Sequence, residues 1–429
     1  MSQDFKTAAS RKRLVPASMA EVTFAITLPP NTPADEDVFL AADFANWRPD
    51  NPAHLFTRGG NIARLTLSLP ANLNFRYKYT RGSWYTTETA ASGILLPNRR
   101  ELAIHNKIIH DNIANWHDRV VRIPLIDSRV KRVTINSTVL KVPKSFYVYL
   151  PPDYDSPSSQ TERYPVLYLF RGHEREWVNA EEDQSRQGRT AIDVYLAALE
   201  RGQVGQMIMV FPGISSDEDT VPGLLVNFRQ PELTGGARGI GTGRFEDYFV
   251  KELMPYVDSH YRTLPQGAYR GVDGFSLGGL TAMKIASQYP GLFGTAGAYD
   301  GTFFYANSNG RGIRQDDRVF RAPLFNPHFG LPRDYNYGAA NNPANLIIRG
   351  DKTELARLTW FIQSGPQSAE PGEANYYRAQ HLLKALAGHA ITNAVTTVLE
   401  NGVHNWATAD RHLGQTLPLH WQKLRPPPL

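Results

Sequence analysis

The stretch YRGVDGFSLGGLTAMKIASQYPGLFG, residues 269–294, decides the fold class of this chain. It reads as a short strand, a turn, and a helix with apolar residues at helical spacing that ends before Pro290. Ser276 lies on the turn, between Gly274 and Gly278. In so tight a turn a Cβ at either glycine would collide with the neighbouring strand or helix. The turn also presents its serine at the carboxyl edge of a parallel sheet, so Ser276 is predicted to be a nucleophile.

Two apolar runs earlier in the chain extend this interpretation. YPVLYLF (164–170) and MIMVF (207–211) are typical of strands buried on both faces, and the helical segment TAIDVYLAALERG (190–202) lies between them. Strand, helix and strand at this spacing predict a right-handed βαβ unit. Residues 116–429 are therefore predicted to form an α/β-hydrolase domain with a doubly wound, mostly parallel sheet.

The first hundred residues have a different pattern. AEVTFAITLP, NIARLTLSLP and LNFRYKYTRGSW are short alternating runs rich in Val, Phe, Thr and Tyr, separated by Pro, Asn, Asp and Gly. No helical period occurs between them, so residues 18–115 are predicted to form a small all-β, immunoglobulin-like sandwich. Residues 1–17 are predicted to be a tail.

The composition excludes several functional classes. The formal charge of +5 is small for 429 residues and the basic residues are scattered, which argues against nucleic-acid binding. No apolar run approaches the ~20 residues of a membrane span. The absence of cysteine excludes thiol catalysis and zinc–thiolate sites. The start of the sequence lacks an apolar signal region, so a cytoplasmic location is expected. We expect no metal or organic cofactor.

A serine nucleophile needs a base and an acid, which follow it in the chain order serine, acid, histidine. His404 comes directly after an apolar strand and before an amphipathic closing helix, so it is the predicted base. The acid is expected in the loop after LTWFIQSG (358–365), which offers Glu370 and Glu373. Glu373, directly before the next helix, is preferred, and Glu370 is the alternative.

The positions of loops and helix starts predict the oxyanion hole and the substrate contacts. Backbone amides of Leu277, at the start of the helix, and His173, in the loop after YPVLYLF, are the expected oxyanion donors. The irregular, glycine-rich segment 213–245 is expected to overhang the pocket. The predicted substrate-binding residues are Arg171, Arg229, Arg238, Arg244 and Trp177; the arginines would suit an acidic or catecholate substrate.

Two family resemblances add to these predictions. VFLAADFANWRP (38–49) and the tyrosine-rich run after it resemble starch-binding-like, early-set immunoglobulin-type modules. In such modules exposed aromatic rings stack on sugars, which implies a possible glycan contact through Trp47 or Trp84. If these tryptophans were instead core residues, no such contact would follow.

The second resemblance covers residues 115–425. FYVYLPPDYD, YPVLYLFRGHEREWVN, GVDGFSLGGLTAMKIASQYPGLFG and LENGVHNW together resemble the putative-esterase family of α/β-hydrolases, which includes enterochelin (siderophore) esterases, feruloyl esterases and mycolyltransferases. The resemblance implies Ser276 as nucleophile, His404 as base and a carboxylate before NYYRAQ. The chain departs from the family in having Arg171 before Gly172, where histidine is usual.

These observations predict a serine carboxylic-ester hydrolase that works through an acyl-enzyme and a Ser-His-Glu triad, most like the siderophore esterases. A small-molecule ester is the expected partner. Three alternatives remain open: a feruloyl or acetyl esterase acting on glycan-linked esters, an acyltransferase, and an inactive glycan-binding scaffold.

Overall fold

The structure is a computed structural model that describes residues 18–120, 124–370, 372–391 and 394–427. The chain divides into two compact units between residues 121 and 122. The predicted boundary at 115/116 falls within strand β9 (Asn115–Trp116), which pairs with β6 (Glu88–Thr89) of the first unit. The first unit therefore extends a few residues further than predicted, and the predicted tail, 1–17, lies outside the described residues.

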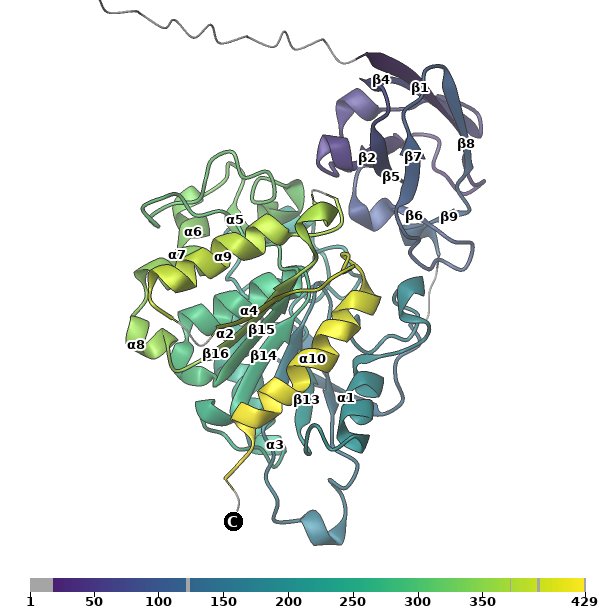
Figure 1. Ribbon diagram of the computed structural model, residues 1–429. Coiled ribbons are helices and arrows are strands. Elements are labelled where there is room, and N and C mark those ends of the chain that lie inside the picture. The colour runs from purple at the N-terminus through teal and green to yellow at the C-terminus, as the bar shows by residue number, and fades with distance from the viewer. Residues whose placement is uncertain (1–17, 121–123, 371, 392–393, 428–429) are drawn as a thin grey trace, which may run out of the picture. The chain divides into compact units, whose positions relative to one another are not determined.

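The described part of the first unit is an all-β structure with two main sheets (Figure 1). One sheet has the order β3-β4-β1-β8 and the other β2-β5-β7. The strands are β1 (Met19–Thr27), β2 (Phe39–Ala42), β3 (Thr57–Gly59), β4 (Ile62–Pro70), β5 (Asn74–Thr80), β7 (Arg99–Leu102) and β8 (Lys107–Asn112). All these pairs are antiparallel except β1 with β8.

The two sheets face each other across an aromatic core. Residues on β1 alternate between buried and more exposed positions at its start, as expected for a strand with one covered face. Phe24 of β1 lies edge-on to Tyr77 of β5, with ring centroids 5.3 Å apart. This packing confirms that the N-terminal unit is a small β-sandwich.

The second unit is built on one large sheet, for which the described residues supply eight strands in the order β10-β11-β13-β12-β14-β15-β16-β17. The pairs β10–β11 and β11–β13 are antiparallel and the others are parallel. The strands are β10 (Val130–Asn136), β11 (Pro143–Tyr149), β12 (Val166–Phe170), β13 (Ile208–Phe211), β14 (Arg270–Gly274), β15 (Thr295–Tyr299), β16 (Thr359–Ser364) and β17 (Ala394–Val398). This confirms the predicted α/β-hydrolase class.

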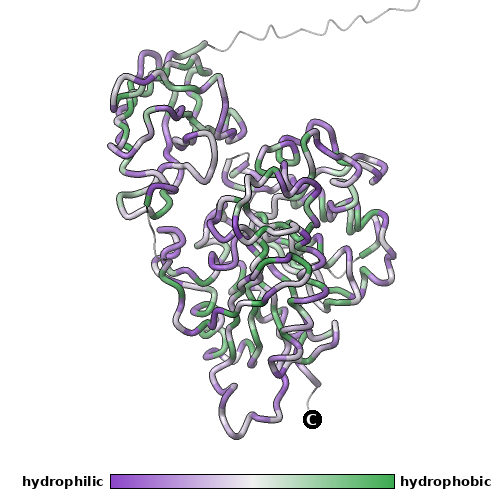
Figure 2. The backbone as a smooth tube through the Cα atoms, turned by 180° about the vertical axis from the view of Figure 1, so that it is seen from behind, coloured by the Kyte–Doolittle hydropathy of each residue, from purple (hydrophilic) through white to green (hydrophobic). Residues whose placement is uncertain are grey.

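Helices cover both faces of this sheet, so its central strands are apolar throughout (Figures 1 and 2). Val166 and Tyr168 pack into the core on one face, and Leu167 and Leu169 into the core on the other. Helices α1 (Ala191–Glu200) and α10 (Trp406–Leu424) share the second of these cores. The first core includes residues of α2 (Phe245–Tyr248), the π-helical turn η8 (Phe249–Leu253), α3 (Met254–His260), α4 (Leu277–Gln288) and α9 (Tyr376–Gly388).

A long excursion separates the neighbouring parallel strands β15 and β16. The chain leaves the sheet after Tyr299 and returns at Thr359, and four short helices form in between. They are α5 (Asn326–Phe329), α6 (Tyr335–Ala340), α7 (Pro343–Arg349) and α8 (Lys352–Leu355). Phe320 and Phe329 pack against each other at 5.0 Å and join the excursion to the core beside α4.

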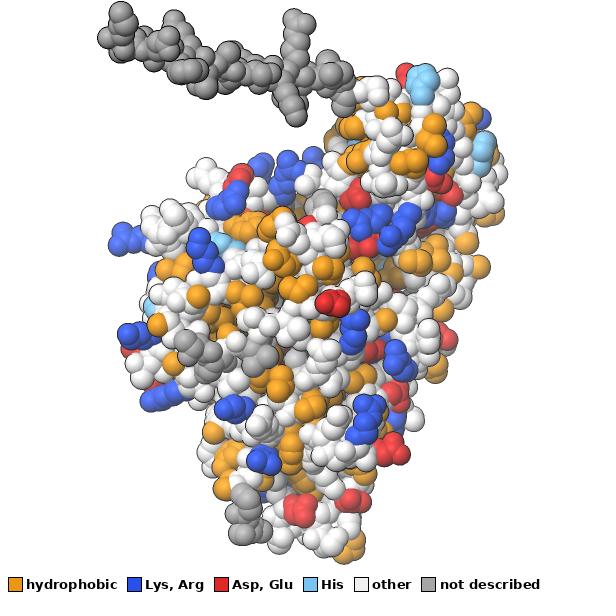
Figure 3. Space-filling model, in the orientation of Figure 1, with side chains coloured by type: hydrophobic (Ala, Val, Ile, Leu, Met, Phe, Trp, Pro, Cys, Tyr) orange, Lys and Arg blue, Asp and Glu red, His pale blue; other side chains and the backbone are white. Residues whose placement is uncertain are grey.

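The surface of the second unit agrees with the scattered charge of the sequence. Lys and Arg side chains are spread over the face seen in Figure 3, with acidic side chains among them. Within the described residues, no helix has both the length and the apolar character that crossing a membrane requires.

Candidate active site

Ser276 occupies a strained turn between β14 and α4. Its backbone has φ 59° and ψ −116°, a left-handed conformation that a side chain rarely adopts. A Cβ on Gly274 would lie 2.3 Å from the backbone of Gly278, and a Cβ on Gly278 would lie 1.8 Å from the carbonyl oxygen of Phe170. Both glycines are therefore required by close contacts, as predicted. Ser276 itself is only 5% exposed, so it lies more deeply than the sequence suggested.

His404 lies beside this turn and contacts a carboxylate. Its ring is 4.8 Å from the ring of Phe275, the residue before the serine. Its Nδ1 is 2.5 Å from Oδ2 of Asp300. The side chain of His404 is 32% exposed, whereas that of Asp300 is fully buried. A buried carboxylate and a partly open imidazole on the same hydrogen bond are the arrangement that the acid–base half of a catalytic triad requires.

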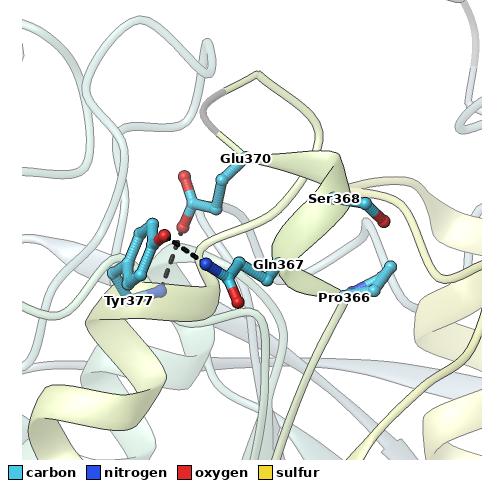
Figure 4. Close-up of a pocket in the computed structure, with 5 residues that line it drawn as sticks. All are labelled: Pro366, Gln367, Ser368, Glu370 and Tyr377. Atoms are coloured by element: carbon cyan, nitrogen blue, oxygen red, sulfur yellow. Dashed lines mark hydrogen bonds between the residues drawn. The ribbon is translucent and has the colours of Figure 1, made fainter.

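The acid at this histidine differs from the predicted one. Glu373 is joined to His404 through the backbone, because the His404 amide donates to the Glu373 carbonyl at 2.8 Å. Glu370 Oε1 instead accepts the Tyr377 amide at 3.1 Å (Figure 4). The structure thus brings the Asp300 carboxylate to His404 Nδ1, where the sequence predicted Glu373 or Glu370.

The physical reason for this correction is the strand order. Asp300 directly follows β15, which lies between β14 and β16, so its carboxylate emerges next to the nucleophile turn. The Ser276 amide donates to the carbonyl of Tyr299 at 3.0 Å, and the Thr302 amide donates to the Ser276 carbonyl at 3.2 Å. A sequence signal for Asp300 existed: it is an aspartate at the end of the apolar run TAGAY, before Gly301.

The loop after β16 holds Asp300 in place. The Asn375 amide donates to Asp300 Oδ1 at 2.7 Å, and the Gly365 amide lies 3.4 Å from the same oxygen. The Asn375 side chain also donates to the Asp300 carbonyl at 2.9 Å. Gly365 and Asn375, at the two ends of the segment where the acid was expected, therefore hold the Asp300 carboxylate in position.

The two predicted oxyanion donors have different surroundings. Leu277 is the first residue of α4, and the described residues offer its amide no hydrogen-bond acceptor. The His173 amide, in contrast, donates to Oε1 of Glu176 at 2.7 Å, a length typical of a charge-assisted bond. Glu176 is 7% exposed, and burial raises its pKa despite the nearby charge of Arg171. The His173 donor is thus committed to a side chain of its own loop.

Arg171, in the loop after β12, contacts both Glu176 and two aromatic rings. Its Nε lies 3.2 Å from Oε2 of Glu176. Its guanidinium also stacks on two rings, 4.8 Å from the centroid of Phe275 and 5.6 Å from that of Trp406. Arg171 and His404 therefore both contact the Phe275 ring, and the charge of Arg171 is paired with Glu176.

The other predicted substrate residues are ion-paired or buried. Arg229 pairs with Asp334 at 3.1 Å and Arg244 with Asp247 at 2.6 Å. Trp177 is 1% exposed and donates its indole N–H to the carbonyl of Phe170 at 2.9 Å. Trp177 is therefore a core residue, which corrects its assignment to substrate binding.

The segment 213–245 is more firmly held than an overhanging loop. Residues 224–226 are buried in the core of the second unit, and Arg238 at its surface pairs with Glu218. The Gly223 amide donates to the carbonyl of Gly172 at 2.8 Å. This part of the segment contacts the loop after β12, which the glycine-rich sequence did not indicate.

A second cluster of buried histidines lies in the middle of the same sheet. Asp273 of β14 accepts from His412 Nε2 at 2.9 Å and from His420 Nε2 at 3.1 Å, and all three side chains are at most 1% exposed. His412 Nδ1 is 2.6 Å from Gln363 Oε1, and His420 Nδ1 is 2.7 Å from Thr295 Oγ1. Burial alone would raise the pKa of Asp273, but the two imidazoles outweigh it and hold that pKa well below its usual range.

The first unit contains the two tryptophans predicted to contact glycan. Trp47 and Trp84 lie 6.3 Å apart, with their ring planes at 50°. Trp84 is 38% exposed and Trp47 is half-buried, and neither belongs to the sandwich core. Across the described parts of both units, no group of three or more His, Asp and Glu side chains is placed to hold a metal ion.

Comparison with known proteins identifies the second unit. Residues 137–322 match the family model described as putative esterase. This segment is therefore similar to the putative-esterase family. An esterase of Mycobacterium tuberculosis is 28% identical over 353 residues, which cover 78% of this chain and 65% of that protein.

Two further matches bear on the fold and on the domain composition. A solved ferulic acid esterase superposes with a TM-score of 0.51 at 20% identity, covering 70% of this chain and 99% of that one, and it shows the shared α/β fold. An alpha-amylase of Niallia circulans is 48% identical over 79 residues, 18% of this chain and 6% of the amylase. The chain thus spans only part of these curated relatives, from 6% of the amylase to 65% of the mycobacterial esterase.

Proposed function

We propose that the chain is a serine carboxylic-ester hydrolase with Ser276 as nucleophile, His404 as base and Asp300 as acid. The observation that carries this proposal is the 2.5 Å contact between His404 Nδ1 and Asp300, beside the strained serine turn. In a triad, this carboxylate selects the imidazole tautomer whose Nε2 faces the serine, and it stabilises the imidazolium that forms.

The reaction follows from these roles. Ser276 Oγ attacks the ester carbonyl while His404 takes its proton, and the tetrahedral intermediate collapses as His404 returns that proton to the departing alcohol. Water then attacks the acyl-enzyme, again losing a proton to His404, and the acid leaves with Ser276 regenerated. The Leu277 amide stabilises the oxyanion from the start of α4. We place the second donor in the loop 171–173, at an amide other than that of His173, which donates to Glu176.

The class of ester is a finer part of the proposal. A siderophore-type catecholate ester would be anionic, and the arginines expected to receive it, Arg171, Arg229, Arg238 and Arg244, are each ion-paired. This pairing favours the alternative, a feruloyl or acetyl ester without a negative charge, because a paired arginine attracts an anion less strongly. An acyltransferase would use the same triad with an alcohol in place of water.

Labelling of the serine tests the proposal directly. A fluorophosphonate probe should modify the intact protein, and peptide mass spectrometry should place the label on Ser276. Ser276→Ala should abolish the label and lower kcat on p-nitrophenyl acetate by at least ~10³-fold. Full activity in Ser276→Ala, or a label on another residue, would overturn the assignment. Methyl ferulate and a ferric catecholate lactone, assayed side by side, distinguish the two substrate classes.

We propose glycan binding as a second function, confined to the first unit. The pair of tryptophan rings outside the sandwich core supports it, because an indole face packs well against a pyranose ring. Native gels containing glycogen should retard the intact protein, and Trp84→Ala should abolish the retardation. Equal migration with and without glycogen would contradict this second function.

A further inference from the structure

Arg186 is a fully buried arginine whose partners come from two separate segments of the second unit. It ends the short helix η6 (Gln184–Arg186). Its Nε and one terminal nitrogen lie 3.0 and 2.9 Å from the two carboxylate oxygens of Asp410, in α10. Its terminal nitrogens also donate to the backbone carbonyls of Glu176, at 2.8 Å, and of Trp177, at 3.1 Å. Four hydrogen bonds from one guanidinium thus join the two segments.

One of these segments follows the proposed base. Helix α10 begins at Trp406, and a single residue separates it from His404. The guanidinium carbon of Arg186 lies 4.6 Å from the centroid of the Trp406 ring. Helix η6 makes a further contact with the same turn, because the Ala407 amide donates to Ser185 Oγ at 3.0 Å. Helix η6 therefore holds the first turn of α10, on which the place of His404 depends.

The other segment secures the loop after β12. The Trp177 indole donates to the carbonyl of Phe170 at 2.9 Å, and the Glu176 carboxylate accepts the His173 amide at 2.7 Å. These two bonds hold the loop in which we place the second oxyanion donor. Trp177 also packs edge-on against Trp406, with ring centroids 5.0 Å apart. A shift of the carbonyls that Arg186 binds would therefore move this loop relative to α10.

The geometry of these bonds requires an arginine. Its planar guanidinium presents five N–H groups in a fixed fork, so it can bind both oxygens of a carboxylate and still reach other acceptors. A lysine has one ammonium on a flexible stem, which cannot hold Asp410 and two backbone carbonyls in one geometry. Arg186 is fully buried and Asp410 is 3% exposed, so water competes little for these bonds.

We infer that Arg186 is a positioning residue, which holds the start of α10, next to His404, and the loop after β12 in a fixed relation. The inference rests on the proposed function, because it is to these segments that we assign the base and the second oxyanion donor. The base must take the proton of Ser276 while the oxyanion donors bind the carbonyl oxygen. Their relation sets the rate of the chemical step, so loss of Arg186 should lower kcat more than it raises KM.

Replacing the buried pair by apolar residues separates positioning from stability. Arg186→Met alone leaves Asp410 as an unpaired buried charge, which destabilises the fold. The double variant Arg186→Met/Asp410→Leu has neither charge, so its melting temperature should return to within a few degrees of that of the unchanged protein. Its kcat on p-nitrophenyl acetate should still be about 30-fold lower, with KM within about three-fold, because the two backbone carbonyls stay unbound. A double variant with normal kcat would overturn the inference.

Arg186→Lys tests the same role in a chain that keeps the charge pair. The ammonium can still neutralise Asp410 but cannot reach both backbone carbonyls, so kcat should fall about 10-fold with little change in melting temperature. A kcat within about two-fold of that of the unchanged protein would contradict the role of Arg186, even if the double variant failed to fold.

Arg270→Met is the matched control. Arg270 is also buried, and it also binds a carboxylate, that of Asp258, and a backbone carbonyl. It begins β14, however, at the end of that strand opposite to Ser276. Its loss should lower the melting temperature and leave kcat within about two-fold. A loss of kcat equal to that of the Arg186 variants would show that these variants act through stability alone.

Counting the active sites keeps the inference separate from the function on which it rests. The end point of fluorophosphonate labelling gives the number of competent sites, and kcat is expressed per labelled site, so that an unfolded fraction does not lower it. The rate of labelling should fall in parallel with kcat, because the same base activates Ser276 in both reactions. If Ser276→Ala retained activity, the serine-esterase proposal would fail, whereas normal kcat in the double variant would remove only the role of Arg186.

Discussion

Two buried aspartates, from neighbouring parallel strands, both accept hydrogen bonds from histidine, but in different surroundings. Asp300, just after β15, and Asp273, in β14, each contact a histidine from the C-terminal part of the chain. The difference is position along the sheet: His404 lies at the carboxyl edge and is 32% exposed, whereas His412 and His420 are fully buried. A histidine–aspartate pair becomes a catalytic candidate where a substrate can reach it and remains structural where none can.

Breaking the contact between Asp300 and His404 should give the largest effect on activity. Asp300→Asn deprives His404 of the carboxylate that orients it, and kcat should fall by about 10³- to 10⁴-fold with KM little changed. Circular dichroism should show an intact fold. Glu373→Gln, the variant at the position that the sequence favoured, should stay within a few-fold of the unchanged protein. A large loss in Glu373→Gln with a small one in Asp300→Asn would reverse the comparison.

Removing the buried pair should affect stability instead. Asp273→Asn leaves two buried imidazoles without their common acceptor charge, which should lower the free energy of unfolding by about 3 kcal/mol or more. Measured below its melting range, the folded variant should keep kcat within a few-fold. A loss of kcat comparable to that of Asp300→Asn, without a loss of stability, would show that the buried cluster takes part in catalysis.

The two kinds of site could be predicted from the sequence to different degrees. The turn at Ser276 is set by two nearby glycines, so their spacing predicts it, and His404 is predicted from its place after the last strand. Asp300 has a local signal, because it ends an apolar run, but no local pattern reports that this strand, β15, lies beside β14.

The pH dependence of stability should also distinguish the buried cluster of Asp273, His412 and His420. The pKa of Asp273 is lower in the folded chain than its ordinary value near 3.9, so the folded state binds fewer protons there than the unfolded state. Its contribution to stability is therefore present above about pH 4 and is lost as the pH falls below that value. Denaturant titrations from pH 6 to pH 3 should show a shallower fall for Asp273→Asn than for the unchanged protein; parallel curves would contradict this linkage.

Substitutions of Glu176, which holds the loop 171–173, should have the smallest effect on kcat. Glu176→Gln preserves an acceptor for the His173 amide and should stay within about 3-fold in kcat, while Glu176→Ala removes the brace and should lose about 10-fold. KM should be similar in both variants. A higher kcat in Glu176→Ala would show that the carboxylate withholds the His173 amide from the oxyanion.

The excursion between β15 and β16 has a consequence for protein engineering. It starts immediately after the acid of the proposed triad and ends at the adjacent parallel strand, so both of its anchor points are fixed by the sheet. Because loop-closure entropy grows only logarithmically with length, doubling such a segment costs about 0.6 kcal/mol. The region containing α5–α8 is thus a segment that can be exchanged: homologous segments of different length can be grafted there while Ser276, Asp300 and His404 keep their spacing.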